Sequence, residues 1–119
     1  MKKILIVEDS PNLREVLEDI LDRTRYTFLE AENGLLALDI FKKEQPDLVL
    51  LDVLMPEMDG ATAFNEIKKI DSNAKVAIVS VVAKHEIEDR FEQYTPDGYI
   101  TKPFDINELR ELVCKILEC

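Results

Sequence analysis

The chain has 119 residues, of which 46% are hydrophobic and 34% charged, a composition that suits one domain with a core and not a disordered segment. Its formal net charge is −10, from 15 basic and 25 acidic residues. This charge argues against direct binding to nucleic acid or to an anionic membrane, because both need a positive protein surface.

The first half of the chain predicts two strand–helix units. Ile4–Val7 is an apolar strand, and a turn at Ser10-Pro11 leads into a helix over about Asn12–Arg23. Thr27–Ala31 reads as a weaker strand. Asn33-Gly34 then turns into a helix whose apolar face holds Leu35, Leu38 and Phe41.

The middle of the chain continues the alternation. Leu48–Leu51 is apolar at every position, with no alternation of apolar and polar residues, as expected for a parallel strand covered on both faces. The loop Val53–Gly60 leads to a helix over about Ala61–Ile70. Lys75–Ser80 is the fourth strand, and a fourth helix is predicted over Ile87–Tyr94.

Gly98–Thr101 is the fifth strand. Asp105 and Glu108 have the spacing of a capping box, in which each residue bonds the backbone of the other. The last helix is expected to bury Ile106, Leu109, Leu112, Val113, Ile116 and Leu117. Five strand–helix units without a linker predict an α/β fold with a parallel sheet, as one domain over residues 1–119.

Polar side chains follow four of these strands. Glu8 and Asp9 close the first strand, Asp52 the third, Ser80 the fourth, and Lys102 follows the fifth. In an open parallel sheet ligands bind at the carboxyl ends of the strands, so these side chains are expected to meet there. Three acids in one place repel one another unless a cation joins them. The spacing therefore predicts a divalent metal, with Mg²⁺ suited to such oxygen ligands.

A carboxylate can attack phosphorus when the developing charge is neutralised, and Asp52 is the candidate nucleophile. Lys102 supplies a point charge for a phosphoryl oxygen, and the Ser80 hydroxyl can donate a hydrogen bond to another. Each residue alone has an ordinary structural explanation, as a turn, cap or surface residue. Their common position at strand ends favours a joint chemical role.

On these motifs the chain resembles the receiver domains of two-component response regulators (CheY-like) over its whole length. The matching segments are Ile4–Ser10, Asp47–Gly60 with its D-x-x-M-P-x-M-D-G pattern, Val79-Ser80, and Asp97–Phe104 with its K-P-F ending. The resemblance implies a doubly wound, flavodoxin-like five-stranded parallel sheet in the order 2-1-3-4-5, with five helices on both faces. It also implies a cis peptide at Lys102-Pro103.

The resemblance further implies a phosphorylation-controlled switch and not an enzyme in the usual sense. Asp52 would accept a phosphoryl group from a phosphohistidine of a sensor kinase or phosphotransfer protein. Mg²⁺, with Mn²⁺ as an alternative, would be held by Glu8, Asp9, Asp52 and the backbone carbonyl of Leu54.

In such a switch Lys102 and Ser80 would contact the phosphoryl group, and Ser80 and Tyr99 would change position. An output protein or a fused output domain would bind the face formed by helix four, strand five and helix five. The protein is expected in the cytoplasm, because no signal peptide or membrane-length apolar run is present and Cys114 and Cys119 are expected to be reduced thiols.

Three other functions remain open. A Mg²⁺-dependent aspartyl phosphohydrolase would want a second acid two residues after the nucleophile, where the chain has Leu54. A flavin-binding protein would need a Ser/Thr/Gly-rich phosphate loop in place of the acidic Glu8–Pro11. A receiver that signals without phosphate is disfavoured by the intact set of polar residues.

Three positions depart from the family pattern. Glu8 replaces the commoner Asp, so a water can lie between it and the metal. Val81 replaces a small residue and is expected to slow phosphate loss by narrowing access to Asp52. Thr95-Pro96 replaces Gly-Ala and is expected to stiffen the connection before the fifth strand.

Overall fold

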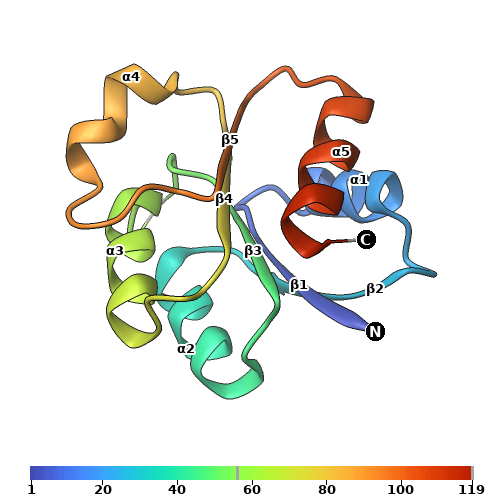
Figure 1. Ribbon diagram of the computed structural model, residues 1–119, viewed down its shortest axis with the longest axis horizontal. Helices are drawn as coiled ribbons and strands as arrows, with labels where there is room; N and C mark the ends of the chain where they lie inside the picture. The colour runs from blue at the N-terminus through green and yellow to red at the C-terminus, as the bar shows by residue number, and fades with distance from the viewer. Residues whose placement is uncertain (56, 119) are drawn as a thin grey trace.

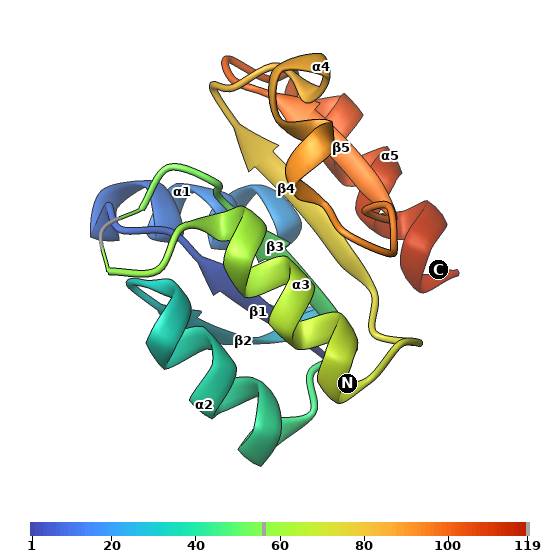
Figure 2. The same cartoon turned by 90° about the vertical axis from the view of Figure 1, so that its left-hand side faces the viewer.

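Five parallel strands lie between two layers of helices in the computed structural model, which describes residues 1–55 and 57–118 (Figures 1 and 2). The strands are β1 (Lys2–Val7), β2 (Tyr26–Ala31), β3 (Leu48–Leu51), β4 (Val76–Ser80) and β5 (Gly98–Thr101). The helices are α1 (Pro11–Leu21), α2 (Gly34–Glu44), α3 (Gly60–Ile70), α4 (Lys84–Ile87), the 3₁₀ turn η1 (Glu88–Arg90) and α5 (Ile106–Leu117). The sheet order is β2-β1-β3-β4-β5, which confirms the predicted doubly wound topology.

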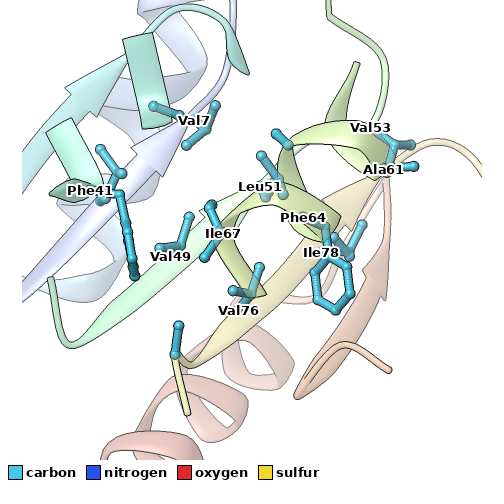
Figure 3. Close-up of a cluster of buried hydrophobic side chains, with 14 of the residues drawn as sticks. Val7, Phe41, Val49, Leu51, Val53, Ala61, Phe64, Ile67, Val76 and Ile78 are labelled. Carbon is cyan, nitrogen blue, oxygen red and sulfur yellow. The ribbon is translucent and has the colours of Figure 1, made fainter. Parts of the chain in front are cut away.

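The sheet separates two apolar cores. On one face α2 and α3 cover a core in which Phe64 is fully buried (Figure 3). The Phe64 and Phe91 rings meet edge to face with centroids 4.9 Å apart, a favoured aromatic geometry. On the other face α1 and α5 cover a core that includes Leu17 and Leu109 (Figure 1). Burial on both faces explains why β3 is apolar throughout and why β4 is apolar up to its last residue, Ser80.

Side-chain caps set where several helices begin. Ser10 accepts a hydrogen bond from the amide of Leu13, and Pro11 occupies the first turn of α1 as predicted. The Asp105 carboxylate accepts hydrogen bonds from the amides of Asn107 and Glu108 at the start of α5. This confirms the Asp105 half of the predicted capping box.

Two details of the predicted helices are wrong. The first helix ends at Leu21, two residues early, because Asp22 has φ of 83° and leaves the helical region. Ile106, predicted to be buried, is 48% exposed. It is the first residue of α5, next to the cap, and the buried positions of that helix are Leu109, Val113 and Leu117.

The largest error concerns the fourth helix, predicted over Ile87–Tyr94. The α-helix spans only Lys84–Ile87 and passes into η1. Tertiary contacts take over the backbone from there: the Asn65 side chain donates 2.9 Å to the carbonyl of Arg90 and accepts 3.0 Å from the amide of Glu92. Backbone groups held by a side chain of α3 are not available for helical hydrogen bonds.

The segment before β5 is anchored by Asp97. Its carboxylate accepts 2.7 Å from the amide of Val76, and its own amide donates 2.7 Å to the Val76 carbonyl. Lys68 of α3 is buried and donates 2.5 Å to the carbonyl of Ala74, with the Asp97 carboxylate 3.5 Å away. These contacts tie the connection to α3 and β4.

The Lys102-Pro103 peptide is cis, as the resemblance implied. Cys114 is disulfide-bonded, so the prediction of a reduced thiol is wrong at that position; Cys119 lies outside the described residues. Among residues 1–55 and 57–118, no helix has the length and hydrophobicity needed to cross a membrane.

Candidate functional site

The strand register brings the predicted acids to one edge of the sheet. Val7 of β1 pairs with Leu51 of β3, so the residues that follow them, Glu8 and Asp52, leave the sheet side by side. The Asp52 amide donates 3.1 Å to the carbonyl of Val7, which holds the two strand ends together. Asp9 is the next residue after Glu8.

These three acids form a compact cluster. One carboxylate oxygen from each of Glu8, Asp9 and Asp52 lies within 4.8 Å of the other two. Glu8 and Asp52 are 4% and 7% exposed, whereas Asp9 faces solvent. The cluster therefore has two buried carboxylates at its base and one at its rim.

Lys102 extends from the end of β5 into the same cluster. Its amide donates 2.8 Å to the carbonyl of Ser80, and its ammonium donates 2.8 Å to Glu8 Oε1 and 3.1 Å to Asp52 Oδ2. Burial opposes the ammonium charge, but these two hydrogen bonds outweigh it and raise the pKa of Lys102. Lys102 is thus charged and positioned against Asp52.

The pKa of Glu8 is also raised, but here burial prevails over the hydrogen bonds that oppose it. Burial raises its pKa from 4.5 to about 7, although the hydrogen bond from Lys102 acts to lower it. Its Oε2 atom accepts 3.1 Å from the amide of Ser10. Burial therefore disfavours the charged form of the Glu8 carboxyl, and the hydrogen bonds with Asp52 and Asp9 add to this in a smaller measure.

The cluster fits a divalent cation. Three acidic groups converge against one ammonium, and carboxylate oxygens are the ligands that Mg²⁺ prefers. Leu54, whose carbonyl was predicted as a further ligand, lies two residues beyond Asp52, and its amide donates 3.0 Å to Asp52 Oδ1. This contact orients the Asp52 carboxylate from the loop side.

Gly60 lets the loop after β3 fold back against Asp52. A Cβ atom built on Gly60 would lie 2.2 Å from the Asp52 carbonyl oxygen, which no real side chain allows. The Gly60 amide donates 3.1 Å to the carbonyl of Val53, and Asp59 caps α3 through the amide of Thr62. The D-G pair of the sequence motif thus sets the start of α3 beside the site.

Ser80 and Tyr99 meet through Val82. The Ser80 side chain, fully buried at the end of β4, accepts 3.2 Å from the amide of Val82. The Tyr99 hydroxyl, from β5, donates 2.6 Å to the carbonyl of the same residue. Both predicted switch residues therefore bond the loop between β4 and α4.

Two residues that contact the site were not indicated by the sequence. Arg14 of α1 donates 2.6 Å to the backbone carbonyl of Glu8, and Val82 joins Ser80 to Tyr99 through backbone atoms alone. Arg14 has no motif around it, because its other partner, Glu30, is 16 residues away. A backbone contact such as that of Val82 leaves no mark on residue type.

The sequence profile described as the response regulator receiver domain matches residues 4–114. The chain therefore belongs to the response regulator receiver domain family. It is 40% identical over 116 residues to sporulation initiation phosphotransferase F of Bacillus subtilis, covering 98% of this chain and 94% of that protein. It is 38% identical to the chemotaxis protein CheY of the same organism, covering 97% of each chain.

Other relatives are longer. The chain is 36% identical to a probable transcriptional regulator, ycf27, of Porphyridium aerugineum. The match covers 98% of this chain but only 48% of that protein. Among solved structures, the response regulator TrrA of Thermotoga maritima in complex with Mg²⁺-BeF superposes with a TM-score of 0.87 at 36% identity, covering 98% of this chain and 99% of that chain. A CheY-like receiver domain of Methanospirillum hungatei gives a TM-score of 0.91 at 26% identity, over 99% and 94% of the two chains.

Proposed function

We propose that this receiver domain is a signalling switch controlled by phosphorylation of Asp52. The donor is a phosphohistidine on a sensor kinase or a phosphotransfer protein. An Asp52 carboxylate oxygen forms the new bond to phosphorus as the bond from phosphorus to the histidine nitrogen breaks. The imidazole, already protonated on its other ring nitrogen in the donor, leaves as the neutral ring. The observation that carries the proposal is the ammonium of Lys102, 3.1 Å from Asp52 Oδ2 in a nearly buried cluster of acids.

Each neighbouring group has a part in this transfer. Lys102 places a positive charge where the phosphoryl oxygens gather, and the Ser80 hydroxyl can donate to one of them once it turns from the Val82 amide. Glu8, Asp9, Asp52 and the Leu54 carbonyl would hold Mg²⁺ or Mn²⁺. When bound, this ion supplies charge neutralisation to the transferring phosphoryl group.

The change of state follows from the new charge. A phosphoryl group on Asp52 adds three strong acceptor oxygens and about −1.5 to −2 charges. Lys102 and Ser80 would turn toward it, which alters the contact between Ser80 and Val82 and, through the Val82 carbonyl, Tyr99. The side of the molecule that carries α4, β5 and α5 (Figure 1) would then bind its partner differently.

The output partner is a separate protein or a domain fused to the receiver. Full-length coverage of the phosphotransferase and the chemotaxis relatives supports the first arrangement, and half-length coverage of the ycf27 relatives supports the second. In either case the domain acts on itself and its donor and does not turn over a substrate.

A direct test uses a small phosphoryl donor. The protein is incubated with Mg²⁺ and acetyl phosphate or phosphoramidate, and its intact mass is measured. We expect one added phosphoryl group, absent in Asp52→Asn and retained in the matched control Asp59→Asn, which alters an aspartate of the same loop outside the cluster. Failure of the wild type to react with either donor, with Mg²⁺ binding retained, contradicts the proposal.

A further inference from the structure

Arg14 connects the acidic cluster to the far edge of the sheet. Its Nη1 donates 2.6 Å to the backbone carbonyl of Glu8, and its Nε donates 2.5 Å to the carboxylate of Glu30 on β2. The Arg14 side chain is 14% exposed and its contact with the Glu8 carbonyl is partly buried, whereas Glu30 is 47% exposed and its ion pair with Arg14 is open to water. One planar guanidinium thus bridges the end of β1 and the neighbouring strand.

Glu30 holds the guanidinium in place. The hydrogen bond from Arg14 lowers the pKa of Glu30, which keeps this carboxylate ionised and the ion pair intact. Glu30 itself is fixed by the sheet, because it pairs with Ile6 in the register of β1 and β2. The orientation of Arg14 is therefore set from the side remote from the cluster.

The contact with Glu8 acts on the backbone that carries two of the three acids. The carbonyl of Glu8 and the amide of Asp9 belong to one planar peptide, so fixing the direction of the carbonyl fixes where the chain continues to Asp9. On the other side the Glu8 amide donates 3.0 Å to the carbonyl of Ala31. The amide of Ser10 binds the Glu8 carboxylate in turn, so Arg14 completes the restraint on this turn.

We propose that Arg14 is a positioning residue of the metal site: its hydrogen bond to the Glu8 carbonyl aims the Glu8–Asp9 turn so that both carboxylates converge with Asp52 on Mg²⁺. This inference rests on the proposed function of the cluster. For the affinity of the site for a cation, the charge of Arg14 and its positioning contact act in opposite directions. Removing a positive charge near an acidic site should strengthen cation binding by charge alone, whereas loss of the positioning contact should weaken it.

The test is a Mg²⁺ titration of unphosphorylated protein, followed by backbone amide resonances. Arg14→Gln is expected to raise the Kd for Mg²⁺ about tenfold, the lower end of the effect of groups that orient metal ligands. Arg14→Lys keeps the charge but not the two-pronged geometry, and is expected to weaken binding as well. Arg23→Gln is the matched control: Arg23 pairs with Glu18 and Asp19 at the other end of α1 and is 46% exposed.

A second measurement needs no metal. In the Mg²⁺-free protein, Arg14→Gln should shift the resonances of the Asp9 and Ser10 amides and speed their hydrogen exchange. Arg23→Gln should leave both the resonances and the exchange rates unchanged. The proposal is overturned if Arg14→Gln and Arg14→Lys bind Mg²⁺ as tightly as the wild type or more tightly. Wild-type protein that binds Mg²⁺ but never becomes phosphorylated would contradict the proposed function and leave the role of Arg14 in Mg²⁺ binding to be decided by the same titration.

Discussion

The Tyr99 hydroxyl donates a 2.6 Å hydrogen bond to the backbone carbonyl of Val82, whose amide donates to Ser80. Ser80 closes β4 beside the acid cluster, and Tyr99 lies in β5. Val82 therefore links the site to the next strand. Burial raises the pKa of Tyr99, so the hydroxyl remains a donor across the neutral range.

Tyr99→Phe should uncouple the site from the side of the molecule near α4. We expect the rate of Asp52 phosphorylation to change less than about twofold, since Tyr99 is not among the groups assigned to the transfer, and stability to fall by about 1 kcal/mol for one hydrogen bond. Amide shifts between Val82 and Ile87 on phosphorylation should shrink. Tyr94→Phe, on a tyrosine 37% exposed, is the control; unchanged shifts in Tyr99→Phe would contradict this coupling.

Lys102→Gln should leave two buried carboxylates without their shared ammonium. The Mg²⁺-free protein is expected to lose about 1–3 kcal/mol of stability, since a buried charged group is left without its partner, and Mg²⁺ should recover part of that loss. Urea unfolding with and without Mg²⁺ measures both effects. Lys69→Gln removes an ammonium whose pairs are exposed and should change stability little. Equal effects of the two variants would argue against the assigned contacts of Lys102.

Gly60→Ala tests the close approach of α3 to the site. Alanine is the better helix former, so the substitution would stabilise α3 by about 1 kcal/mol if space allowed. The backbone carbonyl of Asp52, 2.2 Å from the added Cβ, predicts the reverse sign. In Gly98→Ala the nearest atoms belong to the Leu112 side chain, which can move. Urea unfolding should therefore show a larger loss for Gly60→Ala, together with slower phosphorylation of Asp52.

Val81→Ala tests the expectation that a β-branched residue here protects the phosphorylated state. Val81 follows Ser80 directly, in the loop between β4 and α4, and is 59% exposed. Loss of phosphate from Asp52, measured by intact mass over time, should speed up in the variant. Val16→Ala, on an exposed valine of α1, should decay at the wild-type rate. An unchanged decay in Val81→Ala would refute the expectation.

Asp59 gives a pH-dependent prediction. Burial opposes its charge, but the amide of Thr62 and the guanidinium of Arg90 prevail and lower its pKa below 3.8. A lowered pKa in the folded state means that the carboxylate stabilises the protein above pH 3.8 and that this contribution is lost as pH falls through the folded value. The stability difference between wild type and Asp59→Asn should be constant from pH 7 to 5 and shrink below pH 4 in urea unfolding.

Segments of the chain differ in how well the local sequence pattern predicts their structure. At Ile4–Val7 and Leu48–Leu51 the predicted last residue of each strand agrees with the observed one, because an acid stops the apolar run there, although the first strand begins earlier, at Lys2. At Ile87–Tyr94 the apolar spacing of a helix was present, yet Asn65 of α3 captured the backbone at Arg90 and Glu92. A contact across some 25 residues has no trace in the local pattern.

The sequence by itself determined the order of strands and helices and the convergence of Glu8, Asp9 and Asp52. Alternating apolar runs define parallel strand–helix units, and parallel strands share one carboxyl edge. Only the tertiary structure decided which atoms meet there: the ammonium of Lys102 between Glu8 and Asp52, the guanidinium of Arg14 on the Glu8 carbonyl, and Tyr99 on Val82. These contacts depend on side-chain reach and backbone direction between distant segments, which no spacing along the chain encodes.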